Sequence, residues 1–396
     1  MGCEAMQTFK RAFEHLERPF AWLDLNALDA NIDFINQHAN GKNIRIATKS
    51  IRSKSLLTYI SSKLHSFSGW MTFTAEETLY LLEEGYDHFL IGYPVMEPKG
   101  GRELAKYVKE GKDITFMVDD VRHIQFLQDI ASEYDTTLHI CIDINLSMKT
   151  PFIYFGTRRS SLDSLESLAN LLAQLTQFSN ILVKGLMGYE AQIAGVGDKP
   201  FRKWQTPMIR FLKNSSKKKV SAFRKQAVAD IRQRFSTLEI VNGGGSGSLL
   251  YTAAEEEVTE VTIGSAFFAP ALFDHYHTLH LQPAAGFALR VTRNPASNII
   301  VCHGGGYIAS GAVGKDKQPV PYEQHSYEYY DLEGAGEVQT PLHVRSGLHV
   351  NIGDTVYFRH AKAGELCERF LRLEAKRGDQ YIDSFMTYRG EGKCFL

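Results

Sequence analysis

The sequence has few features that would indicate disulfides, structural zinc or a membrane anchor. Its cysteines are few, odd in number and without a Cys-x-x-Cys pair; they are Cys3, Cys141, Cys302, Cys367 and Cys394. This pattern favours reduced thiols and argues against a disulfide framework or a zinc site. No apolar stretch approaches the roughly 18 residues that a membrane helix requires, and no basic segment followed by an apolar one marks a secretory signal. We therefore expect a cytoplasmic protein with no membrane partner.

The charge balance likewise lacks an excess of either sign. The formal net charge is -1, with 44% hydrophobic and 22% charged residues, which is typical of a soluble globular enzyme and predicts no nucleic-acid partner. The one local basic cluster, residues 213–225, has no interleaved aromatic residues. It predicts a solvated helix start or loop in preference to a contact with a phosphate backbone.

Short apolar runs alternate with amphipathic stretches over residues 18–275, which is the rhythm of repeated βα units. The expected strands are residues 20–25, 44–48, 70–73, 89–92, 114–118, 138–142, 181–187, 238–241 and 258–263, with helices at 27–38, 53–63, 74–84 and 162–174. About eight such units predict an α/β fold in which a closed (β/α)8 TIM-like barrel spans residues 18–275.

After residue 275 the pattern changes to extended segments that no helices separate. These segments are residues 288–292, 298–301, 348–352 and 354–358, with Gly, Pro and Asn between them. The chain of 396 residues is also too long for one ordinary domain. We therefore expect a C-terminal antiparallel β domain of residues 276–396, which residues 1–17 join.

Two features suggest a cofactor-binding site: a lysine at the end of an expected strand, and two glycine-containing turns far downstream. Lys49 ends the run NIRIATK, and VNGGGSGS (residues 241–248) and IGSA (residues 263–266) each follow an apolar strand. A strand-end amine and turns with converging N–H groups suit a phosphorylated aldehyde cofactor. Two simpler readings stay open: Lys49 extends into solvent, and the glycine run is a flexible turn. Neither turn matches the nucleotide-binding pattern GxxxxGK[ST].

With these residues in place, the chain resembles the alanine racemase-like, fold type III enzymes that use pyridoxal 5'-phosphate (PLP). Within them it is most similar to the amino acid deaminase/aldolase branch, akin to D-threonine aldolase and D-serine dehydratase. The segments that carry the resemblance are residues 45–53 (RIATKSIRS), 90–94 (LIGYP), 156–160 (GTRRS), 185–190 (GLMGYE), 241–247 (VNGGGSG), 303–307 (HGGGY), 334–341 (GAGEVQTP) and 358–365 (FRHAKAGE).

The resemblance implies a role for each of several residues. Lys49 would form the Schiff base with PLP, one of Arg158 and Arg159 would lie near the cofactor's phenolic oxygen, and Tyr189 would pack by the pyridine ring. The phosphate would be held by Gly244, Gly245, Ser246, Gly264 and Ser265. The arginine pair could equally lie on the surface, and Tyr189 could be a core aromatic residue.

The segment around His360 departs from the family pattern. The relatives place a divalent metal on a histidine and on a cysteine or aspartate two residues later, whereas this chain has His360 and Lys362. An ammonium repels cations, so a metal on His360 is in doubt, and Cys367 is too far along the chain simply to replace the missing ligand. His360 as an acid/base or hydrogen-bonding group is the alternative. His303 and Glu365 are further polar candidates.

The resemblance implies a PLP-dependent lyase with His360 and Lys49 as catalytic residues. The substrate would be a small β-hydroxy D-amino acid such as D-threonine or D-serine, cleaved as by an aldolase or deaminated as by a dehydratase. One alternative is an amino acid racemase, for which Tyr307 or Tyr322 would supply a second acid/base. Another is a non-catalytic PLP-homeostasis protein, although such proteins lack a C-terminal β domain. The fold type also implies a homodimer.

Overall fold

The computed structural model describes residues 3–149, 154–197, 206–312, 314–345 and 347–396. The chain divides into two compact units. One, called here the barrel unit, comprises Ile35–Lys49, Lys63–Gly264 and Phe395–Leu396. The other, called the sheet unit, comprises Met1–Phe34, Ser50–Ser62 and Ser265–Cys394. The domain boundary expected at residues 275 and 276 stays a prediction.

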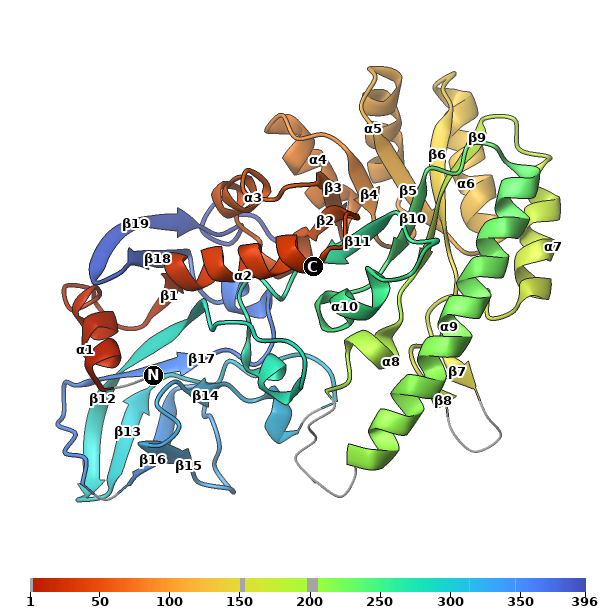
Figure 1. Cartoon of the computed structure of the whole chain (residues 1–396). Coiled ribbons are helices and arrows are strands. Elements are labelled where there is room, and N and C mark those ends of the chain that lie inside the picture. Colours follow the sequence, from red (N-terminus) through yellow and green to blue (C-terminus); the bar gives the residue numbers. More distant parts are fainter. Residues whose placement is uncertain (1–2, 150–153, 198–205, 313, 346) are drawn as a thin grey trace. The chain divides into compact units, whose positions relative to one another are not determined.

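Eight parallel strands form a closed barrel, so the predicted (β/α)8 fold is confirmed (Figure 1). The strands close in the order β10-β11-β2-β3-β4-β5-β6-β9. Their bounds are β2 Asn43–Ala47, β3 Phe67–Thr72, β4 Phe89–Ile91, β5 Ile114–Val118, β6 Leu138–Asp143, β9 Ile181–Gly188, β10 Ile240–Gly243 and β11 Glu260–Ile263. Every residue of β4, β5 and β11 is buried, as expected for parallel strands that are covered on both faces.

A buried ion pair interrupts the apolar interior of the barrel. The guanidinium of Arg45, in β2, bonds both carboxylate oxygens of Glu260, in β11, at 2.7 and 3.0 Å. The amide of Asn242 also donates to Glu260, at 2.7 Å. Gly69 accommodates the pair, because a Cβ there would lie 2.8 Å from Arg45 Nη1 and 2.1 Å from the carbonyl oxygen of His88. These bonds supply the partners that buried charges need.

The helices of the barrel unit begin where capping residues allow. Thr74, Asp120 and Ser164 accept backbone N–H groups at the starts of α4, α6 and α7. The helices are α4 Ala75–Glu83, α5 Pro98–Lys109, α6 Val121–Glu133, α7 Leu165–Leu175, α8 Ala191–Ala194, α9 Thr206–Arg234 and α10 Leu249–Thr252, with 3-10 turns η1 Thr48–Ser50 and η3 Ser246–Ser248 and the antiparallel pair β7 Met148–Lys149 and β8 Tyr154–Phe155. No helix among the described residues is both long enough and apolar enough to span a membrane.

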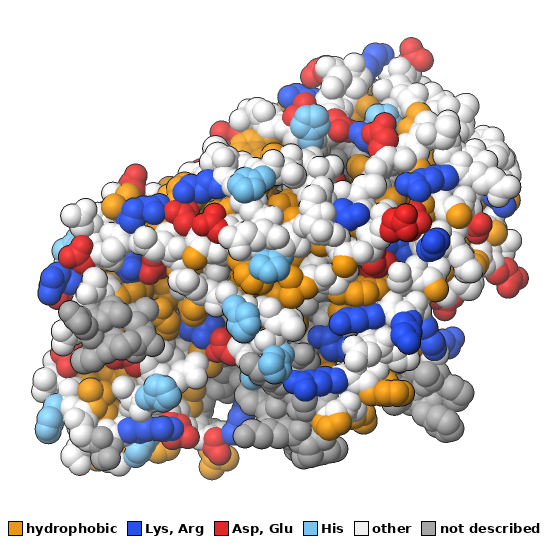
Figure 2. Space-filling view, in the orientation of Figure 1, with side chains coloured by type: hydrophobic (Ala, Val, Ile, Leu, Met, Phe, Trp, Pro, Cys, Tyr) orange, Lys and Arg blue, Asp and Glu red, His pale blue; other side chains and the backbone are white. Residues whose placement is uncertain are grey.

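The basic cluster lies within α9, a helix of 29 residues. Lysine and arginine side chains gather over the surface that α9 occupies (Figure 2). The prediction of a solvated cluster is nevertheless wrong for two members. Lys213 is buried and donates to the carbonyl oxygen of Val196 at 2.8 Å, and Arg224 is only 1% exposed. Both cations have acceptors supplied by other segments, which a charge pattern along one helix does not reveal.

A nine-stranded, mostly antiparallel sheet forms the core of the sheet unit, which confirms the predicted second domain. The main path is β15-β16-β13-β12-β1-β18-β19, and β17 pairs with β12 and β14. The bounds are β1 Phe20–Asp24, β12 Ala285–Ala296, β13 Ile299–His303, β14 Val320–Pro321, β15 Tyr327–Tyr329, β16 Gln339–Val344, β17 Thr355–Arg359, β18 Arg372–Arg377 and β19 Gln380–Met386, with α1 Cys3–Arg11, α2 Leu25–His38, α3 Lys54–Ser61, η4 Ala271–His275, η5 Lys315–Lys317 and η6 Glu365–Glu368.

Two expected strands differ from the structure. Residues 20–24 do form a strand, but it is β1, which pairs with β12 and β18 in the sheet, so their assignment to the barrel is wrong. Residues 348–352 are not a strand. There the chain turns at Gly353, whose φ is +98°, and the backbone N–H of Asn351 donates to Asp354. Ile352 consequently lies 65% exposed, which no core strand position would allow.

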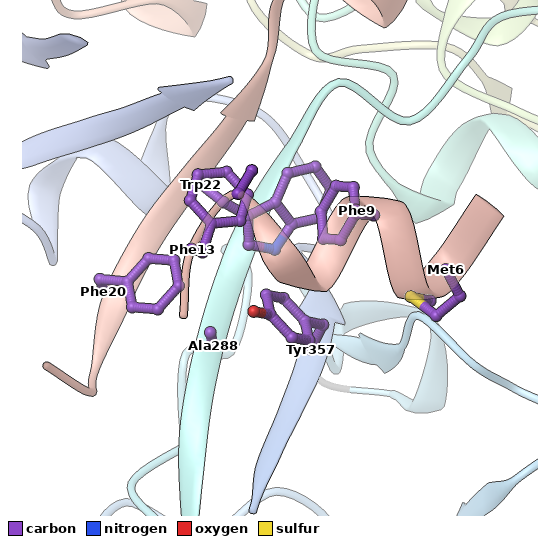
Figure 3. Close-up of a cluster of buried hydrophobic side chains, with 8 residues drawn as sticks. Met6, Phe9, Phe13, Phe20, Trp22, Ala288 and Tyr357 are labelled. Carbon is purple, nitrogen blue, oxygen red and sulfur yellow. The ribbon is translucent and has the colours of Figure 1, made fainter. Parts of the chain in front are cut away.

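An aromatic cluster fixes β1 in the sheet unit (Figure 3). The ring of Trp22 lies edge-on to that of Phe9, from α1, at 5.1 Å between centroids, and the Trp22 indole N–H donates to the carbonyl oxygen of Phe287. Tyr357, from β17, contacts Phe9 at 5.3 Å. Truncating a buried aromatic of this kind costs about 3–5 kcal/mol, which makes this cluster a major source of stability in the sheet unit.

Candidate active site

Polar side chains collect at the carboxyl ends of the barrel strands. Lys49 follows β2, Tyr93 follows β4, Asp143 ends β6, Tyr189 follows β9 and Gly244 follows β10. Because all eight strands are parallel, these residues share one end of the barrel, the end where barrel enzymes place their active sites. The structure thus brings the predicted residues Lys49, Tyr189 and Gly244 to the same end.

Lys49 is exposed, and its ammonium is held by a tyrosine. Lys49 Nζ donates to the Tyr93 hydroxyl at 2.8 Å and lies 5.4 Å from the centre of the same ring. Burial raises the pKa of Tyr93, but the cations Lys49 and Arg159 outweigh that effect and lower the pKa below its usual value of 10.0. Tyr93 was not predicted as a site residue, although it lies in the segment LIGYP at the end of an expected strand.

The two adjacent arginines point to different partners. The Arg158 guanidinium lies 4.2 Å from the ring centre of Tyr154, whereas that of Arg159 lies 6.0 Å from the ring centre of Tyr189. Burial raises the pKa of Tyr189, and the charge of Arg159 opposes the rise. Of the two candidates, Arg159 is therefore the one next to Tyr189 and Tyr93. Its contact with a cofactor stays a prediction.

The glycine-rich turn after β10 needs glycine for two separate reasons. Gly244 has a φ of +89°, which residues with a Cβ seldom adopt. A Cβ on Gly245 would lie 3.0 Å from Cε2 of Tyr189, so the absent side chain lets this ring lie against the turn. The second turn contacts the first, because the N–H of Gly264 donates to Ser246 Oγ at 3.3 Å. Ser265 directly follows Gly264 in the chain.

A buried carboxylate supports this turn from within the barrel unit. Glu190 is fully buried and accepts from the N–H of Gly244 at 3.2 Å and from Ser248 Oγ at 3.0 Å, and the Thr252 hydroxyl also donates to it. Arg224 neutralises Glu190 through a 2.9 Å bond. The shape of the turn is therefore fixed by contacts within the protein.

Arg224 links the turn to α9 and to a second acid. Its guanidinium pairs with Glu255 as well as with Glu190, and it donates to the carbonyl oxygen of Gly188 at 3.1 Å. This triad could not be predicted from the sequence, since Arg224 stands in a run of basic residues and the two acids lie 34 and 31 positions away from it. Only the folded barrel brings the three together.

Asp143 is a second site residue that sequence reasoning missed. The carboxyl is half-buried, and the loss of hydration raises its pKa to about 7 from 3.8, with the negative charge of Asp119 acting in the same direction. The positive charge of Arg159 opposes both effects. The only signal in the sequence was an acid at the end of an apolar strand. A carboxyl with this pKa can hold or release a proton near neutral pH.

His360 belongs to the sheet unit, where it follows β17. It is 3% exposed, and its Nδ1 lies 3.1 Å from the carbonyl oxygen of Ala285, so Nδ1 carries the hydrogen. Burial lowers the pKa of His360 to about 3, which leaves the ring neutral. Among the described residues its Nε2 has no hydrogen-bond partner. The described residues also contain no group of three or more His, Cys, Asp or Glu side chains placed to hold a metal.

The sequence of the barrel matches the model of a known protein family. The model of the alanine racemase N-terminal domain matches residues 23–271, more than half of the chain. The chain belongs to this family. The resemblance drawn from the motifs is thereby confirmed, and membership makes PLP the cofactor of the barrel.

The individual proteins that the chain resembles share 24% or less of their sequence with it. The 3-hydroxy-D-aspartate aldolase of Paracoccus denitrificans (strain Pd 1222) is 24% identical over 263 residues, 66% of this chain and 63% of that protein's length. D-threonine aldolase from Filomicrobium marinum has a TM-score of 0.80 at 17% identity, over 96% of both chains. D-threo-3-hydroxyaspartate dehydratase from Delftia sp. HT23 has a TM-score of 0.76 at 17% identity, over 95% of this chain and 98% of that one. A cysteine-to-alanine mutant of such a dehydratase has been solved in a metal-free form.

The residues present fit PLP. A Cβ on Gly243 would lie 2.8 Å from Thr252 and 3.0 Å from Arg224, so this strand end can approach its support only as glycine. The turn that follows carries hydroxyls and N–H groups of the kind that bind phosphate. Lys49 supplies an amine at the same end of the barrel. The turn would hold the cofactor's phosphate, and Lys49 would bind its aldehyde carbon.

The raised pKa of Asp143 predicts a specific dependence of stability on pH. Between pH about 4 and about 7 the folded protein binds a proton that the unfolded chain has released, so the free energy of unfolding falls as pH rises through this window. Asp143→Asn removes that contribution, and the variant becomes more stable than the wild type at pH about 8 but not at pH about 4. Urea unfolding of both apoproteins measures the difference. A constant difference across the window contradicts the assignment.

The support of the turn by Glu190 is tested with Glu255 as the matched control. Glu190→Gln and Glu255→Gln each remove one carboxylate from Arg224, so both lower the thermal midpoint. Only Glu190 also holds the turn, so Glu190→Gln weakens PLP binding by about 10-fold, the scale of one bond to a charged group, while Glu255→Gln does not. Titration of each apoprotein with PLP gives the dissociation constants. Equal constants would show that Glu190 acts on stability alone.

Proposed function

We propose that this protein is a PLP-dependent lyase that acts on a small β-hydroxy D-amino acid by aldol cleavage or by dehydration and deamination. The observation that carries the proposal is Lys49 at the mouth of a closed barrel, bonded to Tyr93, at the same end as a glycine-rich turn of fixed shape. The three relatives described above are named as aldolases and a dehydratase of D-hydroxy amino acids.

When bound, PLP draws electrons from the Cα of an amino acid that is attached to its aldehyde carbon. The protein then selects which bond at Cα breaks by orienting that bond perpendicular to the ring. Lys49 provides the amine that holds the cofactor and a base at Cα, with its proton shared toward Tyr93. Tyr189 would pack by the cofactor's ring, and Arg159, whose guanidinium lies 6.0 Å from the Tyr189 ring centre, would lie near its phenolic oxygen.

The two reactions require different proton transfers at the substrate's β-hydroxyl. Aldol cleavage needs a base that takes the hydroxyl proton, whereas dehydration needs an acid that assists loss of the hydroxyl group. The resemblance implies the first role for His360, whose ring is neutral and whose Nε2 has no partner within the described chain, although a pKa of about 3 makes it a weak base. Asp143, with a pKa of about 7, suits the second.

The racemase and carrier alternatives find less support. Tyr322, one of the two tyrosines considered for a racemase, stacks on Trp22 with 5.3 Å between ring centres, and Tyr307 packs edge-on against Phe287. Both phenols thus have structural roles in the sheet unit. A non-catalytic carrier would have no use for the nine-stranded sheet that this chain devotes to its second unit.

Substrate panels distinguish these functions directly. Wild-type protein incubated with D-threonine, D-serine or 3-hydroxy-D-aspartate is expected to release an aldehyde with glycine, or an oxo acid with ammonia. Lys49→Ala is expected to lose at least about 1000-fold in turnover, because no other amine replaces it. Product analysis by chromatography reads all outcomes, and Arg158→Ala serves as a neighbouring control that keeps most activity. Formation of the opposite enantiomer alone would favour the racemase, and no product from any amino acid would favour the carrier.

The fold type further suggests a homodimer, and this proposal rests on that resemblance. Sedimentation velocity of the holoprotein at micromolar concentration is expected to give a dimer. A monomer at every concentration would contradict the proposal.

A further inference from the structure

The polar segment that follows β17 in the sheet unit is built around a lysine. Lys362 Nζ donates to the carbonyl oxygen of Ser310 at 2.9 Å, and the N–H of the same Ser310 donates to Glu365 Oε1 at 2.8 Å. Ser310 therefore binds Lys362 through its carbonyl oxygen and Glu365 through its N–H. This arrangement fixes the ammonium two positions after the buried His360.

The donor set of this segment does not fit a divalent metal. His360 offers one lone pair, on Nε2, and the residue at the next ligand position is Lys362, whose ammonium has hydrogens to donate and no lone pair. Cys367 is buried seven residues after His360, and the described residues contain no group of three or more His, Cys, Asp or Glu side chains placed to hold a metal. One nitrogen and a repelling charge make no site for a divalent cation.

Glycine at position 311 brings a second lysine to the same loop. Its φ is +111°, and a Cβ there would lie 3.6 Å from Lys362 Nζ and 3.4 Å from Lys317 Cε. Lys317 pairs with Asp316, so that charge is compensated nearby. The loop thus approaches both lysine side chains closely.

We propose that Lys362 occupies the position at which the lyases that the chain resembles carry the second ligand of a divalent metal, so that this chain binds no divalent metal at His360. The inference does not depend on the proposed lyase function. The absence of metal binding follows from the donor set itself.

Metal binding tests the proposal without reference to turnover. Purified holoprotein, stripped with a chelator and dialysed against Co²⁺, is expected to retain no stoichiometric metal by elemental analysis. Lys362→Cys supplies a ligand two residues after His360, so we expect Co²⁺ affinity to rise by at least about 10–100-fold with thiolate-to-cobalt absorption. Lys317→Cys is the matched control from the same loop and gains neither. Adding His360→Ala to Lys362→Cys abolishes the gain.

Each outcome decides the proposal. Stoichiometric Co²⁺ on the wild type that His360→Ala removes would overturn it, as would failure of both Lys362→Cys and Lys362→Asp, each shown to be folded by circular dichroism, to bind the ion. In the proposed reaction, wild-type turnover is expected to survive chelator treatment unchanged. If no substrate is turned over, the proposed function fails, while the cobalt measurements still decide whether Lys362 stands in the ligand position.

Discussion

The glycine-rich turn depends on one buried carboxylate, that of Glu190. Gly244, Ser248 and Thr252 all donate to it, and as a buried charge it would be unstable without the guanidinium of Arg224. A buried charge that loses its partner costs about 3–5 kcal/mol, so α9 must deliver Arg224 wherever Glu190 lies. The long helix is thereby tied to the turn, and the turn keeps its shape without a ligand.

The sequence was sufficient for features that local pattern determines. Most barrel strands are largely apolar runs, and Lys49 and Gly244 stand just after two strands, so strand ends and candidate residues could be read together. The sequence was insufficient to predict which strands pair with one another. Residues 20–24 are as apolar as any barrel strand, and only their pairing with β12 and β18, with Trp22 in the aromatic cluster, places them in the sheet.

The residues that were missed owe their properties to tertiary neighbours. Arg224 belongs to a basic run in the sequence, yet it is buried because Glu190 and Glu255 meet it. Asp143 acquires its raised pKa from lost hydration and from Asp119, which lies on another strand's loop. A pattern along the chain reports neither contact, since such charges can be judged only once the groups facing them are known.

Replacing a metal by an ammonium would change the electrostatics of a site more than its geometry. At equal distance a single charge attracts an anionic oxygen half as strongly as a divalent ion, and it offers directed hydrogen bonds in place of a coordination shell. A weaker cation leaves the β-hydroxyl less acidic, so more of the proton transfer would fall to a neutral base. His360 is uncharged because burial lowers its pKa to about 3, and its Nε2 has no partner among the described residues, but the same shift makes it a weak proton acceptor.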